Sequence, residues 1–154
     1  MGEQSCEFPL SNASDREIDA ILASARTIAV VGLSDKPHRD SYRVASYLQA
    51  HGYRIIPVNP AADEILGEKS YPNLASIPGD IAVDVVDIFR RPEFVPPIVE
   101  AAIARPARVV WMQLGIVHNA AAEKARAAGL AVVMDRCVKV EHARWAAGGD
   151  RREG

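Results

Sequence analysis

The hydrophobic positions of the chain change spacing along the sequence, between the period of a helix and that of an extended strand. Ser14 and Glu17 form the S-x-x-E pattern that caps helix N-termini. A β-branched run from Thr27 to Val31 comes later and ends at Gly32, which is typical of a strand buried on both faces. Between Glu17 and this run, apolar side chains recur at helical spacing: Ile18, Ile21, Leu22 and Ala25. We therefore predict a helix after Ser14 and a strand at residues 27–31.

The same alternation continues along the rest of the chain. Further strands are predicted at residues 53–58, 81–89, 108–112 and 130–134, and further helices at about 40–51, 62–66, 92–104 and 119–128. Strands that alternate with helices form a parallel sheet covered on both faces, and right-handed crossovers make it doubly wound. We expect a single α/β domain, Rossmann-like, with a mainly parallel five-stranded sheet. It would span residues 13–145, between flexible ends at 1–12 and 146–154 that lack periodic apolar positions.

Length and charge narrow the classes of function. A chain of 154 residues fits one domain. Lys and Arg total 18 against 20 for Asp and Glu, and this balance disfavours nucleic-acid binding. No apolar run approaches the roughly 20 residues that cross a membrane, and the start of the chain does not have the pattern of a secretory signal. With two cysteines, Cys6 and Cys137, a disulfide framework is not expected, and we predict a cytoplasmic protein.

The loop after the first predicted strand has the features of an anion site. Gly32 permits a tight turn and removes a Cβ atom from the path of a ligand. The following helix would turn its free N–H groups toward the loop, with Asp40 or Ser41 as its cap. Hydroxyl and cationic side chains lie between: Ser34, Lys36 and Arg39. Because strand, glycine loop and helix occur in order, we favour a phosphate site over a loop of solvated charges.

The details of this loop disfavour the common nucleotide sites. A dinucleotide fingerprint needs G-x-G-x-x-G, whereas this loop has Gly32 alone. The end of the second strand carries Asn59 and Pro60 where an NAD site has an acidic residue. No P-loop pattern occurs. The residues predict a phosphate-bearing adenine nucleotide of another kind, with an NAD(P)-dependent oxidoreductase as the alternative.

Seven motifs in order resemble a known family. The resemblance extends over about residues 14–145, and its motifs are Ile28–Ser34, Pro37, Val58–Pro60, Ile65–Gly67, Asp87–Pro92, Val110–Gly115 and Met134–Cys137. Together they resemble the small stand-alone CoA-binding proteins, which are similar to the N-terminal Rossmann domain of the succinyl-CoA synthetase alpha subunit. The resemblance implies CoA or an acyl-CoA as the ligand.

The resemblance also implies which residues surround that ligand. Its pyrophosphate would lie over the loop after the first strand, its adenosine near the end of the second strand, and its pantetheine arm near the end of the fourth. The candidate ligand-binding residues are Gly32, Leu33, Ser34, Asp35, Lys36, Pro37, Arg39, Ser41, Asn59, Pro60, Phe89, Arg90, Arg91, Gln113, Leu114 and Gly115.

The chain departs from the synthetase pattern in two respects. Ala61 stands where a lysine meets phosphate, so Lys36, Arg39 or Arg43 would have to hold the 3′-phosphate. The synthetase's second domain, with its phosphohistidine loop, has no counterpart in this sequence, so thiokinase chemistry does not carry over. We expect a CoA-binding protein without catalysis of its own, acting through a homodimer or a protein partner.

Three polar residues are further candidates for chemistry. Cys137 could exchange its thiol with the CoA sulfur beside Arg136 and Lys139, but we favour a half-buried packing cysteine. Asp84 and Asp87 have the odd spacing that places strand side chains on opposite faces, so they do not form an acid–base pair. No catalytic residues and no metal ligands are predicted.

Overall fold

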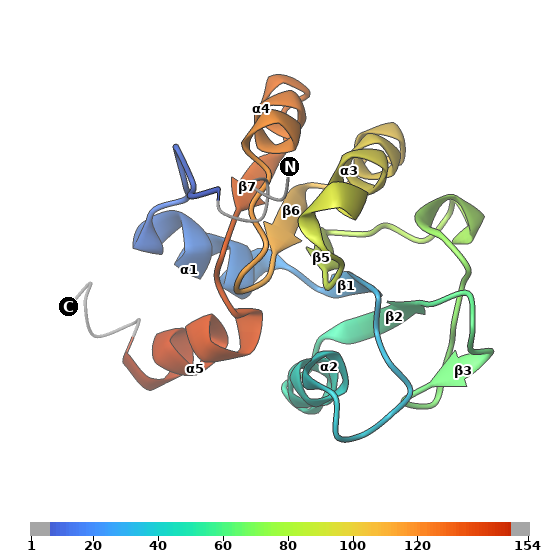
Figure 1. Cartoon of the computed structure of the whole chain (residues 1–154). Helices are drawn as coiled ribbons and strands as arrows, with labels where there is room; N and C mark the ends of the chain where they lie inside the picture. The colour runs from blue at the N-terminus through green and yellow to red at the C-terminus, as the bar shows by residue number, and fades with distance from the viewer. Residues whose placement is uncertain (1–6, 149–154) are drawn as a thin grey trace.

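The computed structural model describes residues 7–148, and the remainder of both predicted flexible ends lies outside the described residues. Its centre is a five-stranded sheet in the order β2-β1-β5-β6-β7, with every neighbouring pair parallel (Figure 1). The predicted Rossmann-like α/β fold is therefore confirmed. The strands are β1 (Thr27–Val31), β2 (Arg54–Val58), β5 (Val85–Ile88), β6 (Val109–Met112) and β7 (Ala131–Val133).

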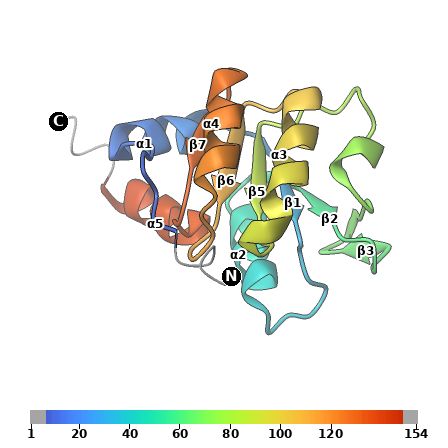
Figure 2. The ribbon, with the colours of Figure 1, turned by 45° about the horizontal axis from the view of Figure 1, so that its top comes forward.

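Helices cover both faces of this sheet. Figure 2 shows α3 and α4 side by side on one face. The other three helices pack on the opposite face, where they share a second apolar core with the sheet. The helices are α1 (Asp15–Ser24), α2 (Asp40–Ala50), α3 (Val95–Ala104), α4 (Asn119–Ala127) and α5 (Val138–Gly148).

The local signals at the start of the chain act as predicted. The Glu17 N–H donates to Oγ of Ser14 at 3.1 Å, and the Ser14 N–H donates to Oε1 of Glu17 at 2.7 Å. All five residues of β1 are buried, as expected for a central parallel strand. The capping box and the β-branched run thus fix the first helix and strand.

The predicted helix at residues 62–66 is wrong. This segment instead forms an antiparallel pair, β3 (Glu64–Ile65) and β4 (Glu68–Lys69). Leu66 and Gly67 between them have φ values of 56° and 77°, the paired positive angles of a tight hairpin turn. A short 3₁₀ helix follows, η2 (Leu74–Ser76).

This hairpin segment also covers the outer edge of β2. The Tyr71 N–H donates to the Pro57 carbonyl oxygen at 3.0 Å, and the Asn59 N–H donates to the Tyr71 carbonyl oxygen at 2.8 Å. Tyr71 pairs in parallel with Val58 as an isolated bridge. The edge of the sheet is therefore partly paired by the chain itself.

Two helices differ from the predicted pattern. The helix predicted at 92–104 divides into a 3₁₀ turn, η3 (Pro92–Phe94), and α3, because prolines fill the first turn of α3. The helix α5 was not predicted, since its buried face carries Glu141 and His142 beside Val138 rather than an apolar stripe. It ends at Gly148, beyond the domain limit expected at residue 145.

The described residues before position 13 are tied to the domain. Oε1 of Glu7 accepts the Asn119 N–H at 2.9 Å, and the Leu10 N–H donates to Oδ1 of Asn119 at 2.9 Å. The side chain of Asn12 pairs with the backbone of Met134 through bonds of 2.8 and 2.9 Å. Residues 7–12 therefore lie against α4 and the end of β7, although the sequence predicted a flexible segment.

Candidate functional site

Two adjoining hollows lie at the carboxyl ends of the strands, where open parallel sheets bind their ligands. The smaller, which we call the loop hollow, has a volume of about 380 Å³ beside the start of α2. The larger cavity has about 600 Å³, in the range of small-molecule sites. Asp40 and Phe89 line both, so the hollows are direct neighbours. The loop hollow is lined by Gly32, Ser34, His38, Arg39, Asp40, Ser41 and Phe89.

The larger cavity has walls from four parts of the chain. They are the first turns of α2, the loops after β5 and β6, and the start of α5. Its lining residues are Asp40, Arg43, Val44, Phe89, Arg90, Arg91, Pro92, Gln113, Leu114, Gly115, Ile116, Cys137, Lys139 and Val140.

Gly32 sits where the chain leaves β1, and no other residue fits there. Its φ is +89°, which L side chains rarely adopt. A Cβ atom would lie 2.5 Å from the Phe89 carbonyl oxygen and 3.0 Å from Cδ of Arg90. The glycine therefore brings the loop after β1 against the end of β5, in addition to opening the hollow.

The start of α2 has no side-chain cap, contrary to the prediction that Asp40 or Ser41 would supply one. The N-cap residue is Arg39, and it makes no capping hydrogen bond. Oγ of Ser41 instead accepts the Ser34 N–H at 2.9 Å, and Oδ1 of Asp40 accepts Nη2 of Arg43 at 2.6 Å. The first N–H groups of this 11-residue helix thus have no side-chain acceptor, which favours an anion beside them.

The remaining residues of the first loop differ in their contacts, and several of them do not line a hollow. Oγ of Ser34 accepts the Lys36 N–H at 3.0 Å and so shapes the turn. Leu33 is fully buried in the core. The side chains of Asp35, Lys36 and Pro37 are exposed, and these residues line neither hollow.

Asn59 joins the end of β2 to the loop after β1. Its Nδ2 donates to the Leu33 carbonyl oxygen at 2.8 Å, and its Oδ1 accepts the Ala61 N–H at 2.8 Å. Both ends of the amide are thus used within the chain. Asn59 and Pro60 line neither hollow.

Basic side chains surround the larger cavity. The guanidinium of Arg90 lies 4.3 Å from the ring centroid of Phe94, and that of Arg91 lies 5.4 Å from it. Nη1 of Arg43 donates to the His38 carbonyl oxygen at 2.5 Å. Lys139 lies with its Nζ 5.4 Å from the centroid of an aromatic ring on α2. The cavity therefore suits a ligand with negative charge at its mouth.

The loops after β6 and β7 are joined to each other and to α5. Oε1 of Gln113 accepts the Val138 N–H at 3.2 Å, and the Gly115 N–H donates to Oδ1 of Asp135 at 2.7 Å. Gln113 is 4% exposed, whereas Leu114 between these contacts is 70% exposed. The cavity wall formed here is thus fixed, with one apolar side chain projecting from it.

Asp87 is a buried carboxyl beneath the larger cavity. Side chains alternate along β5, so Asp87 lies on the same face of the sheet as Phe89, which lines the cavity. Neither of its carboxyl oxygens has a hydrogen-bond partner among the described residues. Burial raises the pKa of Asp87 well above its usual value, because the charged carboxylate is disfavoured away from water.

The candidate residues from the sequence thus fall into three groups. Gly32, Ser34, Arg39 and Ser41 line the loop hollow with Phe89, whereas Arg90, Arg91, Gln113, Leu114 and Gly115 line the larger cavity. Leu33, Asp35, Lys36, Pro37, Asn59 and Pro60 line neither.

Sequence reasoning missed the cavity walls that helices supply. Arg43 and Val44 come from α2, and Lys139 and Val140 come from α5. Cys137 is half-buried and packs against the core, as the packing interpretation predicts, but it also lines the cavity. The sequence analysis named Arg43 as a possible phosphate contact and Lys139 as a neighbour of Cys137, but it did not predict that they line one cavity.

Neither a metal centre nor a membrane span is found in the described part of the chain. Within residues 7–148, no group of three or more His, Cys, Asp or Glu side chains could hold a metal ion. None of the helices there has the length and apolar character that a membrane crossing requires.

The chain is similar to known proteins in both sequence and structure. A family model described as a CoA binding domain matches residues 26–143. YneT of Bacillus subtilis (strain 168) is 45% identical over 134 residues, which cover 87% of this chain and 98% of that protein. A hypothetical protein from Pyrococcus horikoshii OT3 has a structure with a TM-score of 0.83 and 42% identity, covering 90% of this chain and 96% of that one. The alpha subunit of acetate–CoA ligase (ADP-forming) II of Pyrococcus furiosus is 34% identical over 62 residues, which are 40% of this chain and 14% of the subunit.

Proposed function

Because the chain belongs to the family of CoA-binding domains, we propose that it binds CoA or an acyl-CoA with the diphosphate in the loop hollow. The observation that carries this proposal is the uncapped start of α2 beside Gly32. Unpaired helix N–H groups and the positive end of the helix dipole favour a diphosphate at this point. Gly32 keeps the hollow open because it adds no side chain.

The remaining parts of the ligand extend to either side of the diphosphate. The adenosine lies toward the end of β2 at Asn59 and Pro60. The pantetheine arm passes Phe89 into the larger cavity, which adjoins the loop hollow. The basic side chains at the mouth of that cavity add attraction for the charged part of the ligand.

Lys36 and Arg39 hold the 3′-phosphate in this arrangement. Ala61 offers no charge after Asn59 and Pro60. Arg43 is the weaker candidate, since its guanidinium already donates to the His38 carbonyl oxygen and to Asp40. The side chains of Lys36 and Arg39 are exposed at the first loop and can turn to the ligand.

CoA fits this site better than NAD(P) does. A dinucleotide site uses an acceptor at the end of the second strand to hold the ribose hydroxyls. Here the side-chain amide of Asn59 is used by Leu33 and Ala61. Among the described residues we assign no nucleophile with a general base beside it, so the proposed role is binding without catalysis.

Thermal unfolding with CoA, acetyl-CoA, NAD and ATP in parallel tests the proposal. A ligand at about 100 times its Kd adds about 2.7 kcal/mol to the stability of the folded state. For a chain of this size we expect CoA or acetyl-CoA to raise Tm by roughly 5–11 °C, and NAD to leave it unchanged. A rise with NAD and none with either CoA species would refute the proposal.

Calorimetric titration of variants locates the ligand. We expect Lys36→Ala and Arg39→Ala each to weaken CoA binding about tenfold, because each removes a charge-assisted contact to phosphate. Arg54→Ala is the matched control, since Arg54 is equally exposed but lies at the amino end of β2. Equal affinity in all three variants would mean that Lys36 and Arg39 do not hold the 3′-phosphate.

A further inference from the structure

Cys137 stands where the arm of the proposed ligand would end. It lines the larger cavity directly before α5, and its carbonyl oxygen accepts the Glu141 N–H at 2.9 Å. The proposed diphosphate seat adjoins this cavity at Phe89, which lines both. A ligand anchored in the loop hollow therefore extends its free end toward the Cys137 side chain.

The backbone on either side of Cys137 is held in place. Nε1 of Trp111 donates to the Arg136 carbonyl oxygen at 2.8 Å. On the other side, the Val138 N–H donates to Oε1 of Gln113 at 3.2 Å. Both contacts anchor the loop to β6 and its end, so the thiol has a defined position in the wall.

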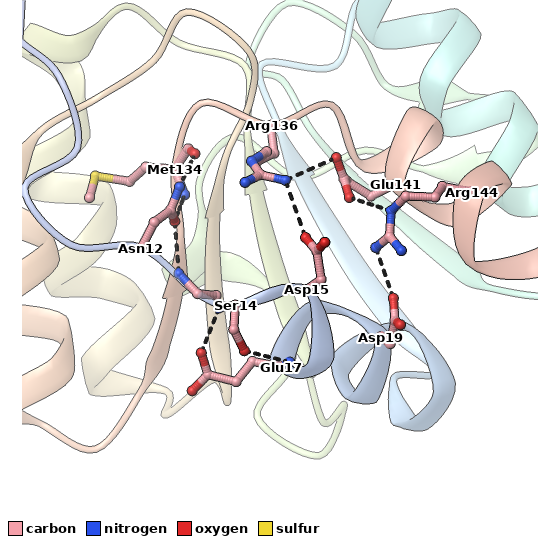
Figure 3. Close-up of polar contacts among 10 residues, drawn as sticks. Asn12, Ser14, Asp15, Glu17, Asp19, Met134, Arg136, Glu141 and Arg144 are labelled. Atoms are coloured by element: carbon pink, nitrogen blue, oxygen red, sulfur yellow. Dashed lines mark hydrogen bonds and ion pairs between the residues drawn. The ribbon is translucent and has the colours of Figure 1, made fainter. Parts of the chain in front are cut away.

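A network of ion pairs joins the loop at Cys137 and α5 to α1 (Figure 3). Nη1 of Arg136 lies 3.7 Å from Asp15 and 3.4 Å from Glu141. Arg144 links Glu141 at 3.2 Å to Asp19 at 2.8 Å. The guanidinium of Arg136 is therefore committed to these carboxylates, and α5 cannot shift without breaking several contacts.

A second observation in the same cavity points to a ligand with amide groups. Gln113 is 4% exposed and lines the cavity, and its Oε1 is already used by the Val138 N–H. No contact described for residues 7–148 gives its Nε2 an acceptor. Nε2 is not among the buried atoms without a partner in the described residues, so it reaches the open space of the cavity, where an acceptor on the ligand can take its hydrogen bond. The pantetheine arm of CoA carries amide carbonyl groups that can accept this bond.

The buried Asp87 adds to this pattern. It lies on the strand next to Trp111, on the face that carries the cavity, and both of its oxygens lack partners among the described residues. The polar groups Gln113 and Asp87 thus lie at and below the cavity floor, where a dry apolar pocket would have none. The cavity is built for a polar arm that ends in a small group near Cys137.

We propose that Cys137 is a thiol-exchange site for CoA in disulfide form. This inference rests on the proposed function. The Cys137 sulfur attacks one sulfur of a disulfide that contains CoA, such as CoA disulfide. A new S–S bond forms between Cys137 and CoA, the original S–S bond breaks, and the departing thiol carries away the proton that Cys137 gave up. The protein is thereby linked to CoA without any further oxidant.

Intact-mass spectrometry of the reduced full chain incubated with CoA disulfide tests this proposal. The chain has two cysteines, so Cys6→Ser and Cys137→Ser are matched variants. We expect a mass gain of one CoA moiety in the parent and in Cys6→Ser, and none in Cys137→Ser. An adduct confined to Cys6, or no adduct in the parent, overturns the proposal.

Two further rate measurements distinguish exchange directed by CoA binding from ordinary thiol reactivity. We expect CoA disulfide to react at least about tenfold faster than glutathione disulfide, because the bound ligand presents its sulfur to Cys137. An excess of acetyl-CoA, which has no free thiol or disulfide, is expected to slow the reaction by occupying the cavity. Equal rates with both disulfides, or no effect of acetyl-CoA, would show that Cys137 reacts without a binding site.

Calorimetry on Cys137→Ser keeps this proposal apart from the proposed function. CoA binding by the variant together with no adduct in the parent overturns the exchange site and leaves the binding function intact. The absence of CoA binding by the parent overturns the binding function and the directed exchange together.

Discussion

The two helical layers of this protein differ in what they bury. Under α3 and α4, the core on the sheet is made of aliphatic, methionine and alanine side chains. Under α1, α2 and α5, the buried residues include the titratable Asp87, Glu141 and His142, together with Gln113. The cavity also opens on this second side, with Cys137 in its wall. Both layers rest on apolar cores, and the second layer also buries polar side chains beside the cavity.

This difference follows from how the layers pack. On the first side α3 and α4 lie against each other over the sheet (Figure 2). On the second side α5 lies against α1 and α2, and the carboxyl ends of β5 and β6 are left open beside it. Polar side chains at these strand ends can therefore face a ligand while remaining shielded from bulk water.

The largest effect is expected from the apolar layer. Met112→Ala removes a fully buried side chain from the core under α3 and α4. We expect a loss of about 2–5 kcal/mol in the free energy of unfolding, because the cavity left behind cannot fully close. Urea unfolding measures the loss, and titration of the folded variant should give an unchanged Kd for CoA. A large change in Kd would contradict the division between the layers.

The next largest effect is expected at the glycine that joins β1 to the site. Gly32→Ala places a Cβ atom 2.5 Å from the Phe89 carbonyl oxygen, in addition to straining a φ of +89°. Gly52→Ala is the control, since Gly52 has a φ of +96° with open space around it. We expect Gly52→Ala to cost about 1–2 kcal/mol. Gly32→Ala should cost more in urea unfolding and should also lose CoA binding, whereas equal losses would mean that the loop moves aside freely.

The smallest effect is expected from a change of pH on the polar layer. Burial raises the pKa of Asp87 above the 3.8 typical of the unfolded chain, so the folded state keeps a proton that the unfolded state releases. Stability therefore falls as pH rises between these two values.

Asp87→Asn should remove this slope, because the amide does not titrate. Urea unfolding at a series of pH values between about 5 and 8 measures it. Asp80→Asn is the control, since Asp80 is exposed and its replacement should leave the slope in place. The same slope in Asp87→Asn and in the parent would show that Asp87 is ionised in the folded protein.

Local signals predicted the frame of the fold well. The capping box at Ser14 and the β-branched strand at residues 27–31 depend on near neighbours, and both are confirmed. The hairpin was missed because Leu66 takes a positive φ that its side chain alone does not predict. The helix α5 was missed because its buried face is polar, and the burial of Glu141 depends on ion pairs with Arg136 and Arg144 that form only in the folded chain.

The sequence also predicted part of the candidate site. Parallel topology brings the strand ends together, so the order of the motifs was enough to assign Gly32, Phe89 and Gln113 to one edge of the sheet. The contributions of Arg43 and Lys139 depend on how α2 and α5 pack over the sheet, which spacing does not reveal. The resemblance to CoA-binding proteins supplied the chemical identity of the ligand, and the family match confirms that resemblance.

The pairing of Tyr71 with the outer edge of β2 affects how copies of this chain can associate. An exposed outer strand is a template on which another molecule can continue the sheet, and such growth leads to aggregates. Pro57 has no N–H to offer on that side, and the Pro57 carbonyl oxygen and the Asn59 N–H are already bonded to Tyr71. The stretch of β2 from Pro57 onward therefore offers an incoming strand little backbone to pair with, and sheet growth along that part of the edge is disfavoured.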